Sequence, residues 1–526
     1  MAKYDFLNKI IQLPNKRINA LFISLLCGVI GAIPYYCDKL FVLTFVSLFT
    51  QFYTVMLQRR ANKGVFLPFF LFFLGFYFSL YLFLSELYPF ERFGFTETQA
   101  VFVVVCSCLL IPILHASVEA MIMWFSKYIP DNTAFPIGCA ALWVLGETLL
   151  TVGSLAFPWA NISVSLTGWL PYLQTASLFG NRFVTFVTVL ICCILAFSLA
   201  VRKKTHAYIG LAVASIYIIS SYALWFIPAE KVEPFNASII QGNVLSNEKW
   251  SSNNRDAIFD RYISMTEDAA KNGADLIFLP ESAIPSRFVE NGRIHKAMSE
   301  IAEYHNVTIF LGINHYDEGD QFNSVIAVMP DGSISERYDK RHLVPFGEFI
   351  PFADSLGKLF PFVGELTSDS GAYSEGDRCV VINTELSNVA PLVCFDSIFP
   401  EFSREAAQNG ATTLAVVTND SWFNDSAGIY THLRHSQLRA IENRRYILRA
   451  ANTGISAFIN PRGEIIESTK PLSPEIVYAD VYNIKDKTLY TATGDLTVYF
   501  SLLLVSILVL YTIRSKTNGK NKITSN

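Results

Sequence analysis

The sequence predicts a multi-helix membrane bundle joined to an α/β domain. Of its 526 residues, 52% are hydrophobic, which is too apolar for a pair of soluble domains. Apolar, charge-poor stretches dominate residues 1–232, whereas residues 233–490 alternate short β-branched runs with polar, helix-like stretches. We therefore expect an N-terminal bundle over 1–232, an α/β domain over 233–490, and a last membrane helix with a basic tail over 491–526.

Apolar runs near the roughly 20 residues that a transmembrane helix needs recur along the chain. Their approximate bounds are 18–36, 39–57, 65–88, 99–124, 136–153, 181–201, 207–227 and 496–513. The sequence thus predicts about eight transmembrane helices, seven before the α/β domain and one after it. The first run is expected to be a retained anchor, because no small-x-small cleavage site follows it.

Lysine and arginine gather in short connections between these runs, and such residues favour the cytoplasmic side of a membrane. The clusters are Lys3, Lys9, Lys16 and Arg17; Arg59, Arg60 and Lys63; Arg202, Lys203 and Lys204; and Arg514, Lys516, Lys520 and Lys522. Seven helices before the α/β domain and one after it bring all four clusters to one side. This arrangement predicts that both termini are cytoplasmic and that the α/β domain lies on the opposite face.

Charge and cysteine content exclude other classes. The formal net charge of -4 provides no basic surplus for binding nucleic acid. No two C-x-x-C pairs occur at zinc-ligand spacing, which argues against a structural metal site. Seven of the nine cysteines lie in or beside apolar stretches, where packing explains them: Cys27, Cys37, Cys106, Cys108, Cys139, Cys192 and Cys193. Only Cys379 and Cys394 remain as candidates for chemistry.

Three ionisable residues follow strand-like runs of the α/β domain, where open sheets collect their functional groups. Glu281 follows "DLIFLP", Lys340 lies in "ERYDKRHLVPFGEFIP", and Cys394 follows "PLV". A cysteine nucleophile needs a base, and a nearby ammonium favours the thiolate and stabilises an oxyanion. Residue types alone leave other interpretations open: a packed cysteine, a solvated Glu or Lys, or a disulfide between Cys379 and Cys394.

The motifs "LPES", "YDKRHLVPFGEFIP" and "PLVCFD", in this order and near these separations, resemble the nitrilase superfamily. Within it, the chain resembles the membrane-bound branch, the apolipoprotein N-acyltransferases. The resemblance extends to "LAFPWANIS", "SIIQGNVLSNEKW", "VVTNDSWFNDSAG" and "RAIENRRYILRAANTGIS". It implies that the α/β domain is an αββα sandwich whose active site faces the membrane.

Carried over by position, the resemblance implies that Glu281 is the general base, Lys340 the oxyanion-stabilising cation and Cys394 the nucleophile. It also identifies Glu348, in "PFGEF", as a second functional acid and Trp250, in "NEKW", as a lipid-side aromatic residue. No metal or organic cofactor is required by this chemistry.

Other positions are expected to shape the site. The family commonly has Tyr and Glu after the nucleophile, whereas this chain has Phe395 and Asp396. Asn419, Asp420 and Trp422 are expected to form the pocket rather than transfer protons. His432 and His435 lack a carboxylate at ligand spacing and are interpreted as helix-surface residues or as residues behind the site. The segment 349–364, rich in Phe and Pro, is either a mobile arm on lipid headgroups or a packed loop.

The implied reaction moves an acyl chain from a phospholipid, usually phosphatidylethanolamine, to the enzyme as a cysteine thioester. The acceptor is the α-amino group of the N-terminal diacylglyceryl-cysteine of an apolipoprotein, in the last step of lipoprotein maturation. The implied location is the bacterial inner membrane, with the catalytic domain on the periplasmic face. A membrane-tethered amidase that uses water as acceptor is the main alternative, and a non-enzymatic scaffold is another.

Overall fold

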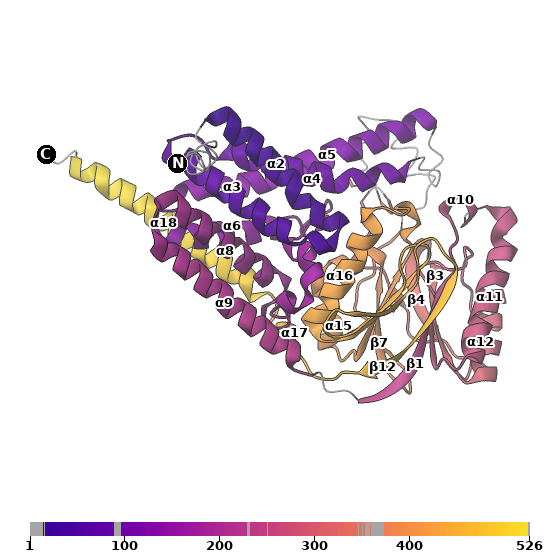
Figure 1. The fold of residues 1–526 in the computed structure, drawn as a ribbon. Coiled ribbons are helices and arrows are strands. Elements are labelled where there is room, and N and C mark those ends of the chain that lie inside the picture. Colours follow the sequence, from indigo (N-terminus) through magenta and orange to yellow (C-terminus); the bar gives the residue numbers. More distant parts are fainter. Residues whose placement is uncertain are drawn as a thin grey trace, which may run out of the picture.

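A computed structural model describes residues 14, 16–88, 96–228, 232–249, 251–345, 347–349, 351–352, 358 and 373–523. It shows a helical bundle on one side and an α/β domain on the other (Figure 1). Trp250 and most of the predicted arm at 349–364 lie outside the described residues.

Each of the eight apolar runs contains a helix. These are α2 (Arg17–Tyr36), α3 (Val42–Arg60), α4 (Phe66–Leu80) continued by the 3₁₀ helix η3 (Tyr81–Leu87), α5 (Glu97–Trp124), α6 (Ala134–Leu149), α8 (Asn181–Val201), α9 (Lys204–Phe226) and α18 (Leu496–Ile523). In the described part of the chain, six helices are long and apolar enough to cross a membrane. The α3 helix is not among them, and α6 is shorter, with 16 residues. The count of eight transmembrane helices therefore stays a prediction.

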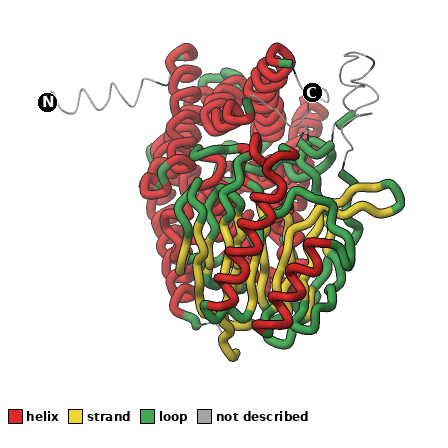
Figure 2. Tube along the Cα trace, turned by 90° about the vertical axis from the view of Figure 1, so that its right-hand side faces the viewer, coloured by secondary structure: helices red, strands yellow, loops and turns green. Residues whose placement is uncertain are grey.

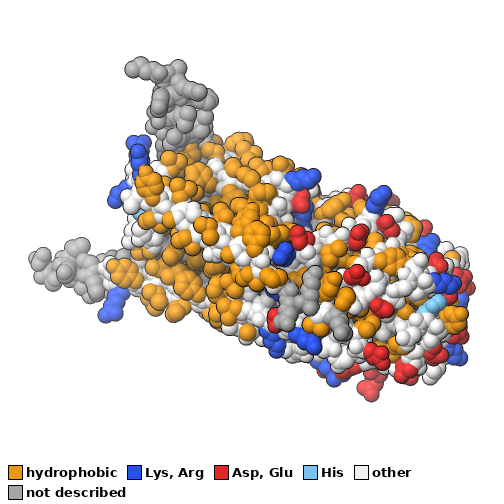
Figure 3. Space-filling model, turned by 60° about the horizontal axis from the view of Figure 1, so that its bottom comes forward, with side chains coloured by type: hydrophobic (Ala, Val, Ile, Leu, Met, Phe, Trp, Pro, Cys, Tyr) orange, Lys and Arg blue, Asp and Glu red, His pale blue; other side chains and the backbone are white. Residues whose placement is uncertain are grey.

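The surface agrees with a membrane protein. Hydrophobic side chains cover the bundle in Figure 3, whereas acidic side chains gather mainly on the α/β domain. Inside the bundle, α2 and α4 approach closely at Gly28, where an added Cβ would lie 2.0 Å from the carbonyl oxygen of Phe72. Small residues at such crossings let helix backbones pack tightly where lipid removes the hydrophobic driving force.

The α/β domain contains two six-stranded sheets. The first has the order β12-β1-β2-β3-β4-β5 and the second the order β11-β10-β9-β8-β7-β6. Their bounds are β1 (Val232–Gln241), β2 (Leu276–Phe278), β3 (Thr308–Asp317), β4 (Asp320–Val328), β5 (Tyr338–Asp339), β6 (Ile382–Asn383), β7 (Asn388–Val393), β8 (Thr413–Thr418), β9 (Tyr446–Ala451), β10 (Ala457–Ile459), β11 (Ile465–Ser468) and β12 (Glu475–Asn483). The β1, β2 and β3 strands pair in parallel, and so do β7, β8 and β9.

The two sheets enclose a common core and are covered by helices on their outer faces. Apolar residues of both sheets meet between them, including Phe278, Phe310, Val393 and Val417. The helices α11 (Arg255–Lys271) and α12 (Arg293–His305) pack on the first sheet, and Figure 2 looks onto this outer layer. The helices α15 (Pro400–Gln408) and α16 (Ala427–Asn443) pack on the second sheet. This layering confirms the predicted αββα sandwich.

The α16 helix also seats the sandwich on the bundle (Figure 1). Arg434 donates hydrogen bonds to the carbonyl oxygens of Pro34 (3.0 Å) and Tyr35 (2.7 Å), at the end of α2. Carbonyls in the last turn of a helix lack intrahelical partners, so the buried guanidinium satisfies them. Glu442, at the other end of α16, accepts a hydrogen bond of 3.1 Å from the backbone N–H of Asn181. The α/β domain is thus fixed to the bundle through its second helical layer.

Candidate active site

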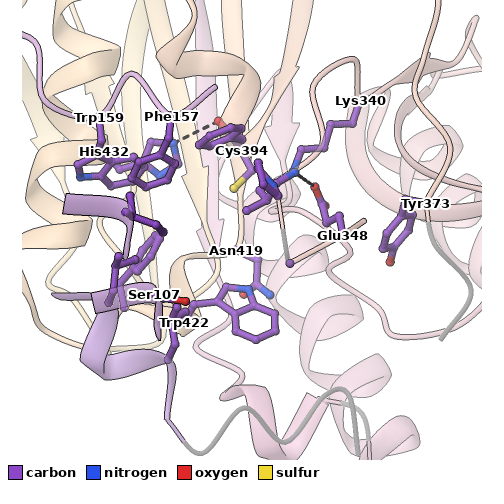
Figure 4. Close-up of a pocket in the computed structure, with 18 of the residues that line it drawn as sticks. Ser107, Phe157, Trp159, Lys340, Glu348, Tyr373, Cys394, Asn419, Trp422 and His432 are labelled. Carbon is purple, nitrogen blue, oxygen red and sulfur yellow. Dashed lines mark hydrogen bonds and ion pairs between the residues drawn. The ribbon is translucent and has the colours of Figure 1, made fainter. Parts of the chain in front are cut away.

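The predicted trio meets in one cavity. Glu281 follows β2, Lys340 follows β5 and Cys394 follows β7, and all three line the same pocket, in which Figure 4 labels Lys340 and Cys394. Asn419, directly after β8, lines it too. Parallel strands present their carboxyl ends at one edge of a sheet, which explains why residues distant in sequence converge here.

Lys340 is a buried cation of the site. Its Nζ lies 2.8 Å from Glu348 Oε2 and 3.9 Å from Glu281 Oε1, and the side chain is 1% exposed. Burial opposes the charge, but Glu348, Cys394 and Glu281 together raise the pKa of Lys340 above its ordinary value. Lys340 is therefore an ammonium throughout the physiological range.

Glu281 is held in place from several sides. Its Oε2 accepts the backbone N–H of Asn419 at 2.7 Å, and its Oε1 accepts the Nδ2 of Asn323 at 2.5 Å. The Nζ of Lys249 donates to the Glu281 backbone carbonyl at 3.1 Å. The Nδ2 of Asn323 also donates to Glu348 Oε1 at 3.2 Å, so one amide group bridges the two carboxylates. The sequence interpretation missed Asn323 and Lys249.

Cys394 stands at a left-handed turn between β7 and the 3₁₀ helix η8 (Cys394–Ile398), with φ of 49°. This conformation is disfavoured for a residue with a side chain. Burial and then the Glu281 carboxylate raise the pKa of the Cys394 thiol, although Lys340 opposes them. The resting residue is thus a neutral thiol, which needs a base when it reacts.

Phe395 and Asp396 face different surroundings. Phe395 lines the cavity and stacks on Phe157 of the bundle with ring centroids 5.7 Å apart. Asp396 accepts hydrogen bonds from Tyr338 Oη (2.8 Å) and from the backbone N–H groups of His342 (2.9 Å) and Val393 (3.2 Å). Burial raises the pKa of Asp396 to about 6, although Lys340 and these donors oppose the shift. Asp396 thus ties the strand that carries Cys394 to the loop that carries Lys340.

The cavity continues from the polar trio into the bundle. Its empty volume is about 1420 Å³, part of which is open to the outside. The apolar part is lined by residues of η3, of α5 and of the loop after α6: Leu84, Leu87, Val103, Ile111, Leu114, Leu155, Phe157 and Trp159. Trp422 and Tyr373 line it from the α/β domain, and Figure 4 shows Trp422 near Asn419. Sequence patterns did not indicate the lining positions on η3 and α5.

The prediction that His432 and His435 lie on a helix surface was wrong, because both are buried. His432 lines the cavity, and His435, three residues farther along α16, does not. Both side chains are 1% exposed, because the sheet covers one face of α16 and the bundle covers the other. The Nε2 of His435 donates to the carbonyl oxygen of Trp159 at 3.2 Å. His432 lies beside Cys394, and its Nδ1 donates to Asp420 Oδ1 at 2.9 Å. The predicted disulfide alternative does not occur, since Cys379 and Cys394 are both free.

Comparison with known proteins matches both halves of the chain. The family model for carbon-nitrogen hydrolases matches residues 236–483, and the model for the apolipoprotein N-acyltransferase N-terminal domain matches residues 27–194. An apolipoprotein N-acyltransferase of Geobacter metallireducens is 31% identical over 378 residues, which are 69% of this chain and 70% of the relative. The chain belongs to the apolipoprotein N-acyltransferase family. It is thus an acyltransferase with a nitrilase-like domain, as the motifs predicted.

A second apolipoprotein N-acyltransferase, from Gloeobacter violaceus, is 30% identical over 364 residues, which are 67% of each chain. Among solved structures, Saccharomyces cerevisiae Nit3, a member of branch 10 of the nitrilase superfamily, aligns with a TM-score of 0.39 and 20% identity. That alignment covers 48% of this chain and 93% of Nit3.

Proposed function

We propose that this acyltransferase takes an acyl chain from a phospholipid, with phosphatidylethanolamine as the usual donor, and holds it as a thioester on Cys394. The chain then passes to the α-amino group of the diacylglyceryl-cysteine that begins an apolipoprotein. Residues 233–490 form the catalytic domain in this proposal. The reaction is a double displacement through one covalent intermediate.

In the first half, Glu281 takes the thiol proton while the Cys394 sulfur bonds to the ester carbonyl carbon. Lys340 and backbone amides stabilise the oxyanion of the tetrahedral intermediate. The ester C–O bond then breaks, and Glu281 returns the proton to the oxygen of the departing lysophospholipid. The raised pKa of the Cys394 thiol supports this order, because proton removal then accompanies attack.

In the second half, the acceptor amine attacks the thioester carbon. Glu281 takes a proton from the amine and returns it to the Cys394 sulfur as the C–S bond breaks, which leaves an amide. Glu348 holds Lys340 as an ammonium at 2.8 Å, whereas Glu281, the proposed base, lies farther from the ammonium, at 3.9 Å. Trp422 and Asn419 form the pocket wall, and Trp250 is proposed as a lipid-side aromatic residue.

One observation carries the proposal: the reactive trio shares its cavity with apolar residues of the bundle. Ile111 and Leu114 of α5 and Leu84 of η3 line the same pocket as Cys394. A hydrolase of soluble amides has no use for such a wall, whereas an acyl chain of a membrane lipid needs one. The water-accepting amidase is therefore the second candidate.

We further propose that the chain lies in a bacterial inner membrane with both termini cytoplasmic and the catalytic domain periplasmic. Basic residues support this orientation. Arg17 donates to the Gly64 carbonyl at 2.6 Å, and Arg60 pairs with Asp131 at 3.1 Å and donates to the Ala200 carbonyl at 3.1 Å. These contacts bring the basic loops together at one end of the bundle, as the positive-inside rule expects.

A mass spectrum of protein incubated with phospholipid, without acceptor, tests the proposal. Wild-type protein should carry a hydroxylamine-sensitive acyl group on Cys394, and Cys394→Ala should carry none. Lys340→Ala should slow acylation by roughly 10²-fold or more, the scale of one lost oxyanion donor. Glu281→Gln should impair both halves, because it keeps the shape but cannot accept a proton.

A diacylated lipopeptide with a free N-terminal amine separates the two candidates. It should discharge the adduct far faster than water and yield a triacylated product. Equal discharge by water, with no N-acyl product, would establish the amidase instead.

A further inference from the structure

His432, on α16, lies beside the proposed nucleophile and lines the same cavity. Its Nε2 lies 3.2 Å from the carbonyl oxygen of Cys394 and 3.1 Å from Ser397 Oγ, and Figure 4 shows His432 beside Cys394. The hydroxyl of Ser397 donates to the same Cys394 carbonyl at 2.7 Å. Two side chains thus converge on one backbone oxygen, that of the proposed nucleophile.

This carbonyl oxygen belongs to Cys394, whose backbone conformation is unfavourable unless contacts stabilise it. Cys394 has a left-handed φ of 49°, and residues with side chains keep this conformation only where their surroundings impose it. The peptide bond is planar and trans, so a fixed Cys394 carbonyl also fixes the oppositely directed N–H of Phe395. Contacts to this carbonyl therefore set both the Sγ direction and the nearest backbone donor.

His432 is itself held rigidly. Its Nδ1 donates to Asp420 Oδ1 at 2.9 Å, and Asp420 also accepts from Arg449 Nη2 at 2.7 Å and from Thr418 Oγ1 at 2.9 Å. Burial opposes the charge on Asp420, but Arg449 and His432 keep the pKa of this carboxyl below its ordinary range. The ring of Trp159, from the bundle, packs on His432 with centroids 5.6 Å apart. The imidazole thus has one orientation, with Nε2 toward Cys394. When both ring nitrogens carry protons, Nδ1 donates to Asp420 and Nε2 donates to the Cys394 carbonyl; the neutral ring keeps the bond to Asp420 and accepts from Ser397 Oγ through Nε2.

Ser397, His432 and Asp420 have the order of contacts of a serine hydrolase triad. Ser397, however, is 0% exposed and is not among the residues that line the cavity, so its hydroxyl does not meet a substrate there. The arrangement suits support of the neighbouring turn rather than a second nucleophile.

We propose that His432 is a positioning residue that holds the turn at Cys394 in its reactive geometry. The proposal rests on the proposed function, in which Cys394 is the nucleophile. His432 also lines the cavity, but in this proposal it acts through its contact with the Cys394 carbonyl. It should therefore affect the acylation rate constant at saturating phospholipid, and not the phospholipid concentration that gives half the maximal rate.

Two substitutions separate positioning from simple packing. In His432→Gln, the longer side chain can bring its amide to the place of Nε2, beside the Cys394 carbonyl. In His432→Asn, the amide can replace only Nδ1, facing Asp420. His435→Asn is the matched control, because His435 is equally buried on the same helix and packs on the same Trp159, with centroids 6.1 Å apart.

The measurement is single-turnover thioester formation on purified full-length protein, with melting temperature recorded for each variant. His432→Asn should lower the acylation rate constant by roughly 10- to 100-fold, the scale of a small misplacement of a reacting group. His432→Gln should recover most of that loss, and His435→Asn should acylate at the wild-type rate even if it melts earlier. If His432→Asn does not fold, Ser397→Ala should show a smaller loss in the same rate constant.

An equal loss in His435→Asn, no recovery in His432→Gln, or acylation by His432→Asn within twofold of wild type would overturn the positioning role. If His432→Asn does not fold, an unchanged rate constant in Ser397→Ala would also overturn it. Absence of any thioester in wild-type protein would instead overturn the proposed function, so the two failures are distinguishable.

Discussion

Lys340 lies closer to Glu348 than to Glu281: its Nζ is 2.8 Å from Glu348 Oε2 and 3.9 Å from Glu281 Oε1. Glu348 is therefore the nearer counter-charge of the buried ammonium, while Glu281 accepts hydrogen bonds from Asn323 and from the backbone N–H of Asn419. In the proposed mechanism, this division keeps the base and the cation in separate roles although they share one cavity.

Glu348→Gln should remove the compensating charge and draw Lys340 toward Glu281, which would weaken the base. We expect acylation to slow by roughly 10²-fold, on the scale of losing one group that stabilises the transition state. Glu405→Gln is the control, because Glu405 pairs with Arg341 at 2.6 Å and does not line the cavity. Equal rates in the two variants would contradict the assigned pairing.

The pH dependence of Cys394 alkylation should distinguish a neutral resting thiol from a preformed thiolate. The thiolate is the reactive species, and burial with Glu281 raises the pKa of Cys394, so alkylation should keep rising above about pH 9, where a free cysteine levels off. Glu281→Gln should speed alkylation near pH 8 while it impairs acyl transfer, because it removes the charge that opposes the thiolate.

Lys340→Met should have the opposite effect on alkylation, since Lys340 lowers the pKa of this thiol. Iodoacetamide labelling followed by peptide mapping measures the extent of alkylation at Cys394 separately from that at the other cysteines. A plateau of Cys394 labelling at or below neutral pH in wild-type protein would contradict this assignment.

Cys379→Ser should retain most activity. Cys379 packs at the margin of the core between the second sheet and its helices, and it does not line the cavity. Peptide mapping without reductant should find free thiols at Cys379 and Cys394, as the structure has them. A crosslinked pair in active protein would refute both this prediction and the assignment of Cys394 as nucleophile.

The sequence allowed prediction of the helices and of the place of Glu281, Lys340 and Cys394 near strand ends. The catalytic roles of these three residues came from the family resemblance and stay proposals. Apolar runs mark the helices, and ionisable residues after strand-like runs mark the edge of a sheet. Residues whose place depends on pairing between distant segments were missed. Asn323, inside β4, resembles any polar strand residue until the sheet brings it within 2.5 Å of Glu281.

The α16 helix shows a second reason why the sequence alone was not enough for prediction. Its polar residues suggested a solvated face, yet 16 of its 17 residues are buried, all but Tyr430, because the sheet and the bundle cover opposite sides. His432 was therefore expected either on a helix surface or behind the site, whereas the structure buries it beside Cys394, with Nε2 3.2 Å from the Cys394 carbonyl oxygen. Charged residues on a helix that lies between two layers cannot be told from surface residues by periodicity alone.

The proposed orientation predicts the response of two reporter fusions. An enzyme active only in the cytoplasm should give signal when fused after Asn526, which follows the basic end of α18. The same reporter inserted within 470–480, which covers the end of the connection after β11 and the first part of β12, should give none. Signal from the insertion within 470–480 would place the catalytic domain in the cytoplasm and contradict the proposed topology.

Ile111→Trp tests whether the apolar part of the cavity holds the acyl chain. Ile111 lines that cavity from α5, so an indole there should fill space needed by a long chain. We expect thioester formation from a long-chain phospholipid to fall by roughly tenfold or more, the scale of about 1.4 kcal/mol in the barrier. A short-chain donor should be affected less.

Leu110→Trp is the control, because Leu110 is adjacent on the same helix, 60% exposed on the bundle surface and not part of the cavity wall. Equal losses in both variants, or equal losses for long and short donors, would mean that the chain lies elsewhere.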